Sequence, residues 1–304
     1  RNRFKAKQSQ KMKVYAMRIG MQQTCFGDVS LAKCFVGARR AGAEGIGLCY
    51  RTADEARCLG DPRHLQKVRS LAERFDLAVT GLYLGTLCAD ESLIGPAPVI
   101  SQASELVRRA IAASAELGKP DVIVPFFGRN RIELPKEFET AWTAVSELAE
   151  FAEDHGVTLA VESSLHLGQL QQFLAGCGSD FVKVCLDTGD VTACRHDPAN
   201  MITGLGATHI AQVHLKDVCV ASGLPPDFNV RLGRGNVNFH SVASALQGVG
   251  YDGWVVLETP PGDDRGAIVA ANIEYARSLL GMLRLTQQQD EDTDAALLAK
   301  GGVS

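Results

Sequence analysis

The chain has 304 residues, of which 46% are hydrophobic and 22% are charged, so it carries enough apolar material for one large domain with a buried core. Its formal net charge of -4 gives no electrostatic reason to expect nucleic acid as a partner. No apolar run reaches the length of about 18 residues that a membrane-spanning helix needs, so we expect no membrane partner.

The cysteines and the terminal segments indicate the expected cellular compartment and the expected domain boundaries. The nine cysteines are an odd number and include no CxxC pair, which predicts a reduced, cytoplasmic protein with mostly buried thiols. The first residues, RNRFKAKQSQKMK, are basic and lack the apolar segment of a secretory signal. We therefore expect a basic extension over residues 1–12, one domain over 13–285, and an acidic and polar tail over 286–304.

Short apolar runs typical of strands alternate with amphipathic runs typical of helices. The predicted strands cover residues 14–20, 44–50, 77–84, 121–127, 157–162, 181–187, 209–215 and 254–258. The predicted helices cover residues 31–42, 62–75, 101–118, 135–155, 166–176, 198–205, 239–249 and 264–283. Eight strand-plus-helix units predict a single-domain α/β protein, a closed (β/α)8 TIM barrel, and no GxGxxG motif follows the first strand to favour a dinucleotide-binding sheet.

The last four predicted strands each end in a side chain that can bind a divalent cation, namely Glu162, Asp187, His214 and Glu258. Because the C-terminal ends of barrel strands meet on one face, these four side chains are predicted to converge. Three carboxylates and one imidazole favour one divalent metal ion, Mn²⁺, Mg²⁺, Co²⁺ or Zn²⁺, and leave positions open for substrate oxygens.

The same residues indicate a chemistry. A divalent ion that chelates the hydroxyl and carbonyl oxygens of a sugar acidifies the adjacent C–H bond. One carboxylate then removes the proton and another returns it, which is isomerisation or epimerisation through an enediolate. Glu162 and Glu258 are the predicted acid–base pair.

Other side chains near the strand ends are candidates for contacts with substrate. They are Asp190, His166, Lys216, Asp217 and Arg234. The structural alternatives are a helix cap for Asp217, an exposed first helical turn for His166, and a solvent-facing loop side chain for Arg234. Tyr83 and Phe126 end two strands and are candidate pocket walls, with core packing as the alternative.

Several motifs carry a family resemblance. They are VE at 161–162, LDTGD at 186–190, HLKD at 214–217, LGRGNVNF at 232–239, YDGWVVLE at 251–258, and the early GARRAGAEGIGL. In this order they resemble the xylose isomerase-like TIM barrels, specifically the sugar phosphate isomerase/epimerase family with its ketose 3-epimerases, hydroxypyruvate isomerase and inosose dehydratase. The resemblance implies that Glu162, Asp187, His214 and Glu258 are metal ligands and that Glu162 and Glu258 are the acid–base pair.

The chain departs from the family pattern in three places. Asp190 stands where members often have a histidine that contacts substrate. The stretches SSLHLG after Glu162 and LKDVCV around Lys216 lack the second glutamate and the arginine that ketose 3-epimerases tend to place there. These departures argue against a free-ketose epimerase in the narrow sense.

We therefore expect a metal-dependent isomerase or epimerase whose partner is a small carbohydrate, sugar phosphate or keto-polyol. The nearest alternative is a dehydratase of the inosose or dehydroshikimate type, in which a β-hydroxyl leaves after proton abstraction. An endonuclease IV-like DNA repair enzyme needs more histidines and a basic face, and a barrel that only binds does not need all four ligands. The sequence leaves a homo-oligomer open.

Overall fold

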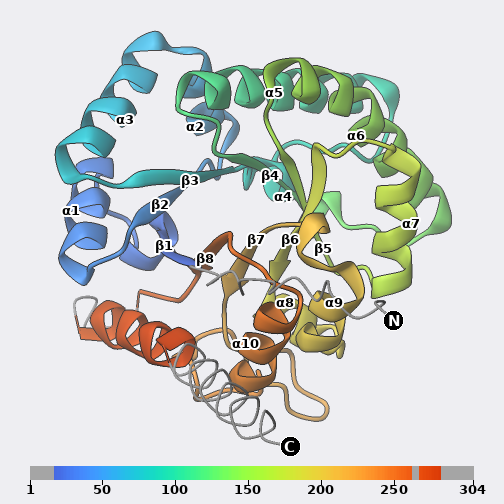
Figure 1. The fold of residues 1–304 in the computed structure, drawn as a ribbon. Coiled ribbons are helices and arrows are strands. Elements are labelled where there is room, and N and C mark those ends of the chain that lie inside the picture. Colours follow the sequence, from blue (N-terminus) through green and yellow to red (C-terminus); the bar gives the residue numbers. More distant parts are fainter. Residues whose placement is uncertain (1–16, 262–266, 282–304) are drawn as a thin grey trace, which may run out of the picture.

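Eight parallel strands form a closed ring in the computed structural model, which describes residues 17–261 and 267–281 (Figure 1). They are β1 (Arg18–Gln22), β2 (Gly45–Cys49), β3 (Ala78–Tyr83), β4 (Asp121–Phe126), β5 (Leu159–Ser163), β6 (Val182–Asp187), β7 (Ile210–Leu215) and β8 (Trp254–Leu257). Pairing of β1 with both β2 and β8 closes the ring, from Arg18 opposite Trp254 to Met21 opposite Leu257. The predicted (β/α)8 TIM barrel is confirmed.

Helices surround the ring (Figure 1). They are α1 (Leu31–Ala41), α2 (Ala53–Arg57), α3 (Pro62–Phe75), α4 (Thr86–Ala89), α5 (Ala97–Glu116), α6 (Pro135–His155), α7 (Leu167–Cys177), α8 (Thr188–Ala193), α9 (Pro198–Leu205) and α10 (Phe239–Gly248). Residues 267–281 are also helical. Within the described part of the chain, no helix combines the length and apolar character needed to cross a membrane.

Local sequence signals fix the ends of several helices. Helix α3 begins where the Asp61 carboxylate accepts a hydrogen bond from the Arg63 N–H, with Pro62 in the first turn. Helix α6 ends at Gly156, whose left-handed backbone (φ 62°) suits a residue without a Cβ. The observed bounds confirm the predicted starts of both helices, at Pro62 and Pro135, and the predicted end of α6 at His155.

Several predicted boundaries are wrong by a few residues, and those of β1 and α5 have identifiable causes. Strand β1 begins at Arg18 and does not include Met17, because its extent is set by pairing with β2 and β8 rather than by its own apolar run, and the predicted residues 14–16 lie outside the described residues. Helix α5 begins at Ala97 rather than at Ser101, because Pro98 lies in the first turn, where a missing N–H costs no helical hydrogen bond. The expected extension at 1–12, the tail at 286–304 and the start of the 264–283 helix lie outside the described residues.

All nine cysteines are free, as expected, but fewer are buried than predicted. Cys25, Cys34 and Cys185 are buried, while Cys58 and Cys219 are exposed and the other four are half-buried. Burial raises the pKa of the Cys185 thiol, so this group inside the barrel is neutral.

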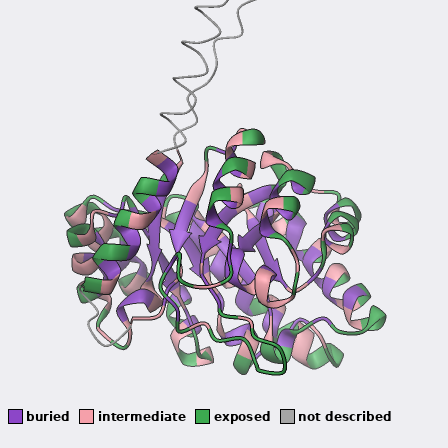
Figure 2. Cartoon of the chain, turned by 90° about the horizontal axis from the view of Figure 1, so that it is seen from below, coloured by how far each residue is buried: buried purple, intermediate pink, exposed green. Residues whose placement is uncertain are grey.

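The main core lies between the strands and the helices. Figure 2 shows the strands buried and the exposed residues on the outer helices and loops. In this layer Phe173 of α7 packs edge to face against Phe126 of β4 and Phe138 of α6, with ring centroids 6.1 and 5.6 Å apart. Phe126 is therefore a core residue, so the predicted pocket wall is wrong at this position and the core-packing alternative holds. Inside the ring, Ile123, Ala160 and Cys185 form a second apolar cluster, against which Tyr83 packs.

Replacement of Phe173 tests the core between sheet and helices. Phe173→Ala removes a fully buried ring and is expected to lower the free energy of unfolding by about 3–5 kcal/mol, measured by urea denaturation. Leu224→Ala, at a loop side chain that is 68% exposed, is the control and is expected to change stability by less than about 0.5 kcal/mol. A Phe173→Ala loss as small as that of the control contradicts the packing described above.

Candidate metal and acid–base site

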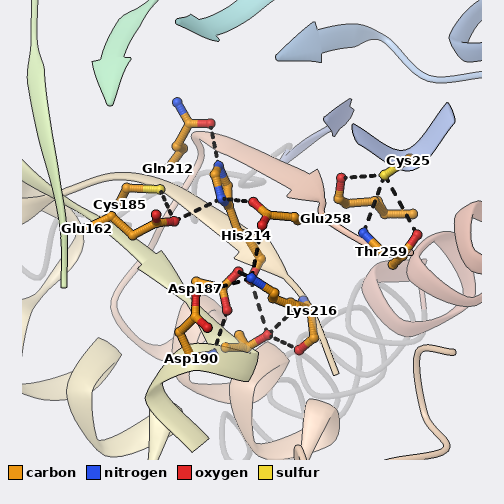
Figure 3. A network of polar contacts seen from close by, with 12 residues as sticks. Cys25, Glu162, Cys185, Asp187, Asp190, Gln212, His214, Lys216, Glu258 and Thr259 are labelled. Atoms are coloured by element: carbon orange, nitrogen blue, oxygen red, sulfur yellow. Dashed lines mark hydrogen bonds and ion pairs between the residues drawn. The ribbon is translucent and has the colours of Figure 1, made fainter. Parts of the chain in front are cut away.

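Four side chains from consecutive strands converge at the C-terminal end of the barrel. Glu162 lies on β5, Asp187 ends β6, His214 lies on β7 and Glu258 follows β8. One ligand atom of each lies within 4.8 Å of those of the others. Figure 3 shows the His214 ring between the two glutamates, with its Nδ1 3.2 Å from Glu162 Oε1 and 3.0 Å from Glu258 Oε2.

The donor set fits a divalent cation. Asp187 Oδ2, His214 Nδ1 and Glu258 Oε2 are buried atoms without a hydrogen-bond partner. Buried polar atoms are ordinarily paired, so unpaired ones that face a common centre indicate a shared ligand. Ion-to-ligand distances of about 2.0–2.6 Å put ligand atoms within about 5 Å of one another, which matches the observed spacing. Three carboxylates and one imidazole are ligands that Mn²⁺, Mg²⁺, Co²⁺ and Zn²⁺ accept.

The motif LDTGD builds one side of this cluster. Asp187 Oδ1 accepts a hydrogen bond from the Asp190 N–H at 2.7 Å and so caps α8, which leaves Oδ2 for the cluster. The Thr188 hydroxyl lies 2.8 Å from the Lys216 carbonyl oxygen and accepts from the Lys216 N–H at 3.1 Å, which joins α8 to the end of β7. A Cβ at Gly189 would lie 2.9 Å from Lys216 Cγ, so glycine is required for this close approach.

Lys216 lies at the rim of the cluster. Its Nζ is 2.9 Å from Glu258 Oε1, 3.2 Å from Asp190 Oδ2 and 3.9 Å from Asp187 Oδ2, and its side chain is only 18% exposed. The Phe228 ring covers the ammonium at 5.0 Å from its centroid. The positively charged Lys216 ammonium therefore lies next to Asp190, the residue that departs from the family pattern.

Burial and charge shift the pKa values of the cluster in opposite directions. Burial raises the pKa of Asp187 well above its usual range and that of Asp190 to about 6, despite the opposing charge of Lys216. Burial acts in the same sense on Glu258, but Lys216 and His214 outweigh it and lower the pKa of that carboxyl. For His214, burial favours the neutral ring, and the acidic groups around it outweigh burial and raise the pKa.

A separate polar chain holds Glu258 in place (Figure 3). The Glu258 N–H donates to the Leu215 carbonyl oxygen at 3.0 Å. The Cys25 thiol donates to the Leu257 carbonyl oxygen at 3.2 Å and accepts from the Thr259 N–H at 3.4 Å. Asn272 in turn donates to the Thr259 hydroxyl at 3.1 Å. Sequence patterns gave no sign of these supports, because the partners are more than ten residues apart and Cys25, Thr259 and Asn272 belong to no motif.

Asp217 holds a loop rather than facing the cluster. Its Oδ2 accepts from the N–H groups of Arg234 and Gly235 at 3.1 and 2.8 Å, and its Oδ1 accepts from that of Val237 at 3.2 Å. The carboxylate is buried, and a Cβ at Gly235 would clash with it. The observed role is therefore to position the segment 232–239, and the helix-cap alternative for Asp217 is wrong.

The remaining candidates lie further out. His166 is exposed and caps α7, where its Nδ1 accepts from the Gln169 N–H at 3.4 Å. Arg234 is exposed on the loop that Asp217 holds. Burial, and then the charges of Glu162 and Glu258, raise the pKa of the Tyr83 phenol.

The fold and this cluster define a class of protein, a TIM barrel whose C-terminal face gathers carboxylates around one histidine. The chain belongs to the xylose isomerase-like TIM barrel family, whose family model matches residues 35–279. This finding confirms the resemblance that the motifs indicated.

Relatives and solved structures agree with the family. The 2-epi-5-epi-valiolone 7-phosphate 2-epimerase of Actinoplanes sp. is 29% identical over 241 residues, which cover 79% of this chain and 86% of the relative. An L-ribulose 3-epimerase structure has a TM-score of 0.73 at 20% identity, covering 90% of this chain and 97% of the other. A 3-keto-D-glucoside 4-epimerase from E. coli has a TM-score of 0.70 at 17% identity, covering 86% and 99%.

Metal affinity is expected to fall as the pH falls. The raised pKa values of Asp187 and His214 mean that both groups hold protons that a cation must displace, so a lower pH strengthens the competing proton. Calorimetric titration with Mn²⁺ between about pH 8 and pH 6, in two buffers of different ionisation enthalpy, measures both the affinity and the protons released. Asp187→Asn is expected to release fewer protons. An affinity that is independent of pH contradicts this prediction.

The loop anchor is tested by Asp217→Ala. Loss of a charged acceptor that serves several N–H groups is expected to lower the free energy of unfolding by about 2–3 kcal/mol and to speed hydrogen exchange at residues 234, 235 and 237. Asp227→Ala, at an exposed residue of the same connection that accepts one hydrogen bond from the Asn229 N–H, is the control. Equal exchange rates in the two variants contradict the assigned role.

Proposed function

We propose that this protein is a divalent-metal-dependent epimerase or isomerase of a small carbohydrate, sugar phosphate or keto-polyol, working by proton transfer through an enediolate. The observation that carries the proposal is the placement of Glu162 and Glu258 on opposite sides of His214 Nδ1, at 3.2 and 3.0 Å. Two carboxylates from β5 and β8 thus flank one centre.

The two glutamates are the proposed acid–base pair. One removes the proton from the carbon beside the substrate carbonyl, and the other returns a proton to the same or the neighbouring carbon. Glu258 is the proposed base, because Lys216 at 2.9 Å stabilises its ionised form. Glu162 is almost fully buried and accepts a hydrogen bond from the Cys185 thiol at 3.7 Å, which keeps it oriented toward the centre.

Glu162, Asp187, His214 and Glu258 are the residues that would hold the ion. A bound divalent cation would polarise the substrate carbonyl and make the adjacent C–H bond more acidic. Asp190 and Lys216, as an ion pair at the rim, are proposed to hydrogen-bond substrate hydroxyls. His166 and Arg234 stay proposed contacts for the part of the substrate that projects from the barrel.

The comparisons support the reaction class. The relative at 29% identity is named as an epimerase of a valiolone phosphate, and the two solved structures above are named as epimerases of ketose or keto-glucoside substrates. These names favour a small carbohydrate-like substrate.

A second candidate is elimination on the same scaffold. Lys216 favours it, because an ammonium 2.9 Å from the proposed base is a proton donor of the kind that a leaving hydroxyl needs. The two reactions differ in their products. Epimerisation and isomerisation keep the substrate mass, whereas elimination lowers it by one water.

Substitution of each glutamate tests the proposal. With Mn²⁺ supplied and a panel of ketoses, sugar phosphates and keto-polyols as substrates, Glu162→Gln and Glu258→Gln are each expected to lower kcat by about 10²–10⁴-fold, because an amide cannot exchange a proton as a carboxylate does. Chromatography with mass detection in D₂O measures turnover, product mass and deuterium incorporation.

Glu139→Gln, at an exposed glutamate on α6, is the matched control and is expected to keep full activity. Circular dichroism checks that both site variants are folded. Wild-type turnover in either variant, or a product without deuterium at the reacting carbon, contradicts the proton-transfer mechanism.

A further inference from the structure

Gln212 connects His214 with the opposite side of the barrel. It lies on β7 two residues before His214, is fully buried, and its Oε1 is 3.2 Å from His214 Nε2. Its Nε2 is 2.8 Å from Asp121 Oδ2 on β4 and 3.3 Å from the Thr80 carbonyl oxygen on β3. Because β3 lies opposite β7 in the ring of eight strands, this one side chain spans the barrel interior.

Room for the Gln212 amide comes from Gly81. A Cβ at that position would lie 3.0 Å from Gln212 Nε2 and 2.9 Å from Ile123 Cδ1. Both distances are shorter than normal contacts, so a larger residue would push the amide away from Asp121 and Thr80. The interior of the barrel is thus shaped around this side chain.

The surroundings of Gln212 determine which way its amide points. The Thr80 carbonyl oxygen can only accept a hydrogen bond. Burial raises the pKa of Asp121 to about 6, so at neutral pH its carboxylate is ionised and also only accepts. The end of the amide that faces them must therefore be the NH₂ group, and the end that faces His214 must be the carbonyl oxygen.

The same logic extends to the imidazole ring. A carbonyl oxygen only accepts, so His214 Nε2 must carry a hydrogen. In the neutral ring Nδ1 then has the lone pair, and it is Nδ1 that faces Glu162 and Glu258 (Figure 3). Nδ1 is also the ring nitrogen that belongs to the four-residue cluster, so it is the one that a shared cation would reach.

We propose that Gln212 is a positioning residue that fixes His214 as the Nε2–H tautomer, and that Asp121 sets the orientation of the Gln212 amide so that Nδ1 is the metal-binding nitrogen. The inference rests on the proposed function in that it takes His214 as a metal ligand. It assigns roles to Gln212 and Asp121, which belong to none of the motifs of the site.

We call the proposed sequence of contacts from Asp121 through Gln212 to His214 the relay. Measurements of metal affinity and histidine NMR spectra together test it, with Zn²⁺ as a diamagnetic probe. In the wild-type protein, ¹⁵N spectra of the Zn²⁺-loaded state are expected to show a protonated Nε2 and a metal-bound Nδ1 on His214. Gln212→Leu is expected to weaken Zn²⁺ binding by about 10–100-fold, measured by competition with a chelator. Thr80→Val, which removes a buried hydroxyl but keeps the Thr80 carbonyl, is the control and is expected to keep wild-type affinity.

Exchanging the Gln212 amide and the Asp121 carboxylate between the two positions distinguishes the proposed positioning role of Gln212 from simple packing. Gln212→Glu places two acceptors face to face at Asp121, and Asp121→Asn supplies a group that can donate or accept and so no longer fixes the amide orientation. Each is therefore expected to weaken Zn²⁺ binding. The double variant restores one carboxylate facing one amide, and a carboxylate still accepts from His214 Nε2–H, so it is expected to bind more tightly than either single variant.

The outcomes distinguish this inference from the proposed function. Zn²⁺ binding that Gln212→Leu leaves unchanged, ligation through Nε2, or a double variant no better than its parents overturns the relay alone. Absence of Zn²⁺ binding by the wild-type protein overturns both the relay and the metal site.

Discussion

The site has to offset the repulsion between closely spaced carboxylates. Glu162, Asp187, Asp190 and Glu258 are gathered at one end of the barrel, and each would be less crowded in solvent. Strands fixed on both sides by their neighbours hold the backbone in spite of that repulsion. Positive charge has to offset the rest, and Lys216 at the rim supplies part of it, to which the proposed metal ion would add.

The need for positive charge explains the local design around Lys216. Gly189 lets α8 approach its aliphatic stem, Thr188 holds its main chain, and Phe228 covers its ammonium. Asp190 sits within 3.2 Å of the ammonium, so the position where the family often has histidine carries a carboxylate with a partner of its own. Asp190 thus forms an ion pair with Lys216, so its difference from the family histidine is accompanied by a partner of opposite charge.

The parts of the site that follow from local sequence could be predicted, and those that depend on contacts across the barrel could not. Strand ends that close on Glu162, Asp187 or His214 are visible in the sequence, and barrel closure then brings them together. Gln212 gave no such signal, because its partners at Thr80 and Asp121 are 132 and 91 residues away. The closed ring of eight strands and its eight main helices were predicted, but several element ends and the short helices α2, α4 and α8 were not. The ends of β1 and α5 depend on strand pairing and on a proline in a first helical turn.

The way Asp217 holds its loop has a consequence for how such proteins diversify. Its contacts with residues 234, 235 and 237 are all made to main-chain N–H groups, which almost any amino acid supplies. Of these three residues, Gly235 must lack a Cβ because the carboxylate lies against it, and Val237 is buried, so the exposed side chain of Arg234 is the one that can change in evolution while the path of the segment stays the same. New ligand preferences can therefore arise at the barrel entrance without disturbing the chemistry beneath it.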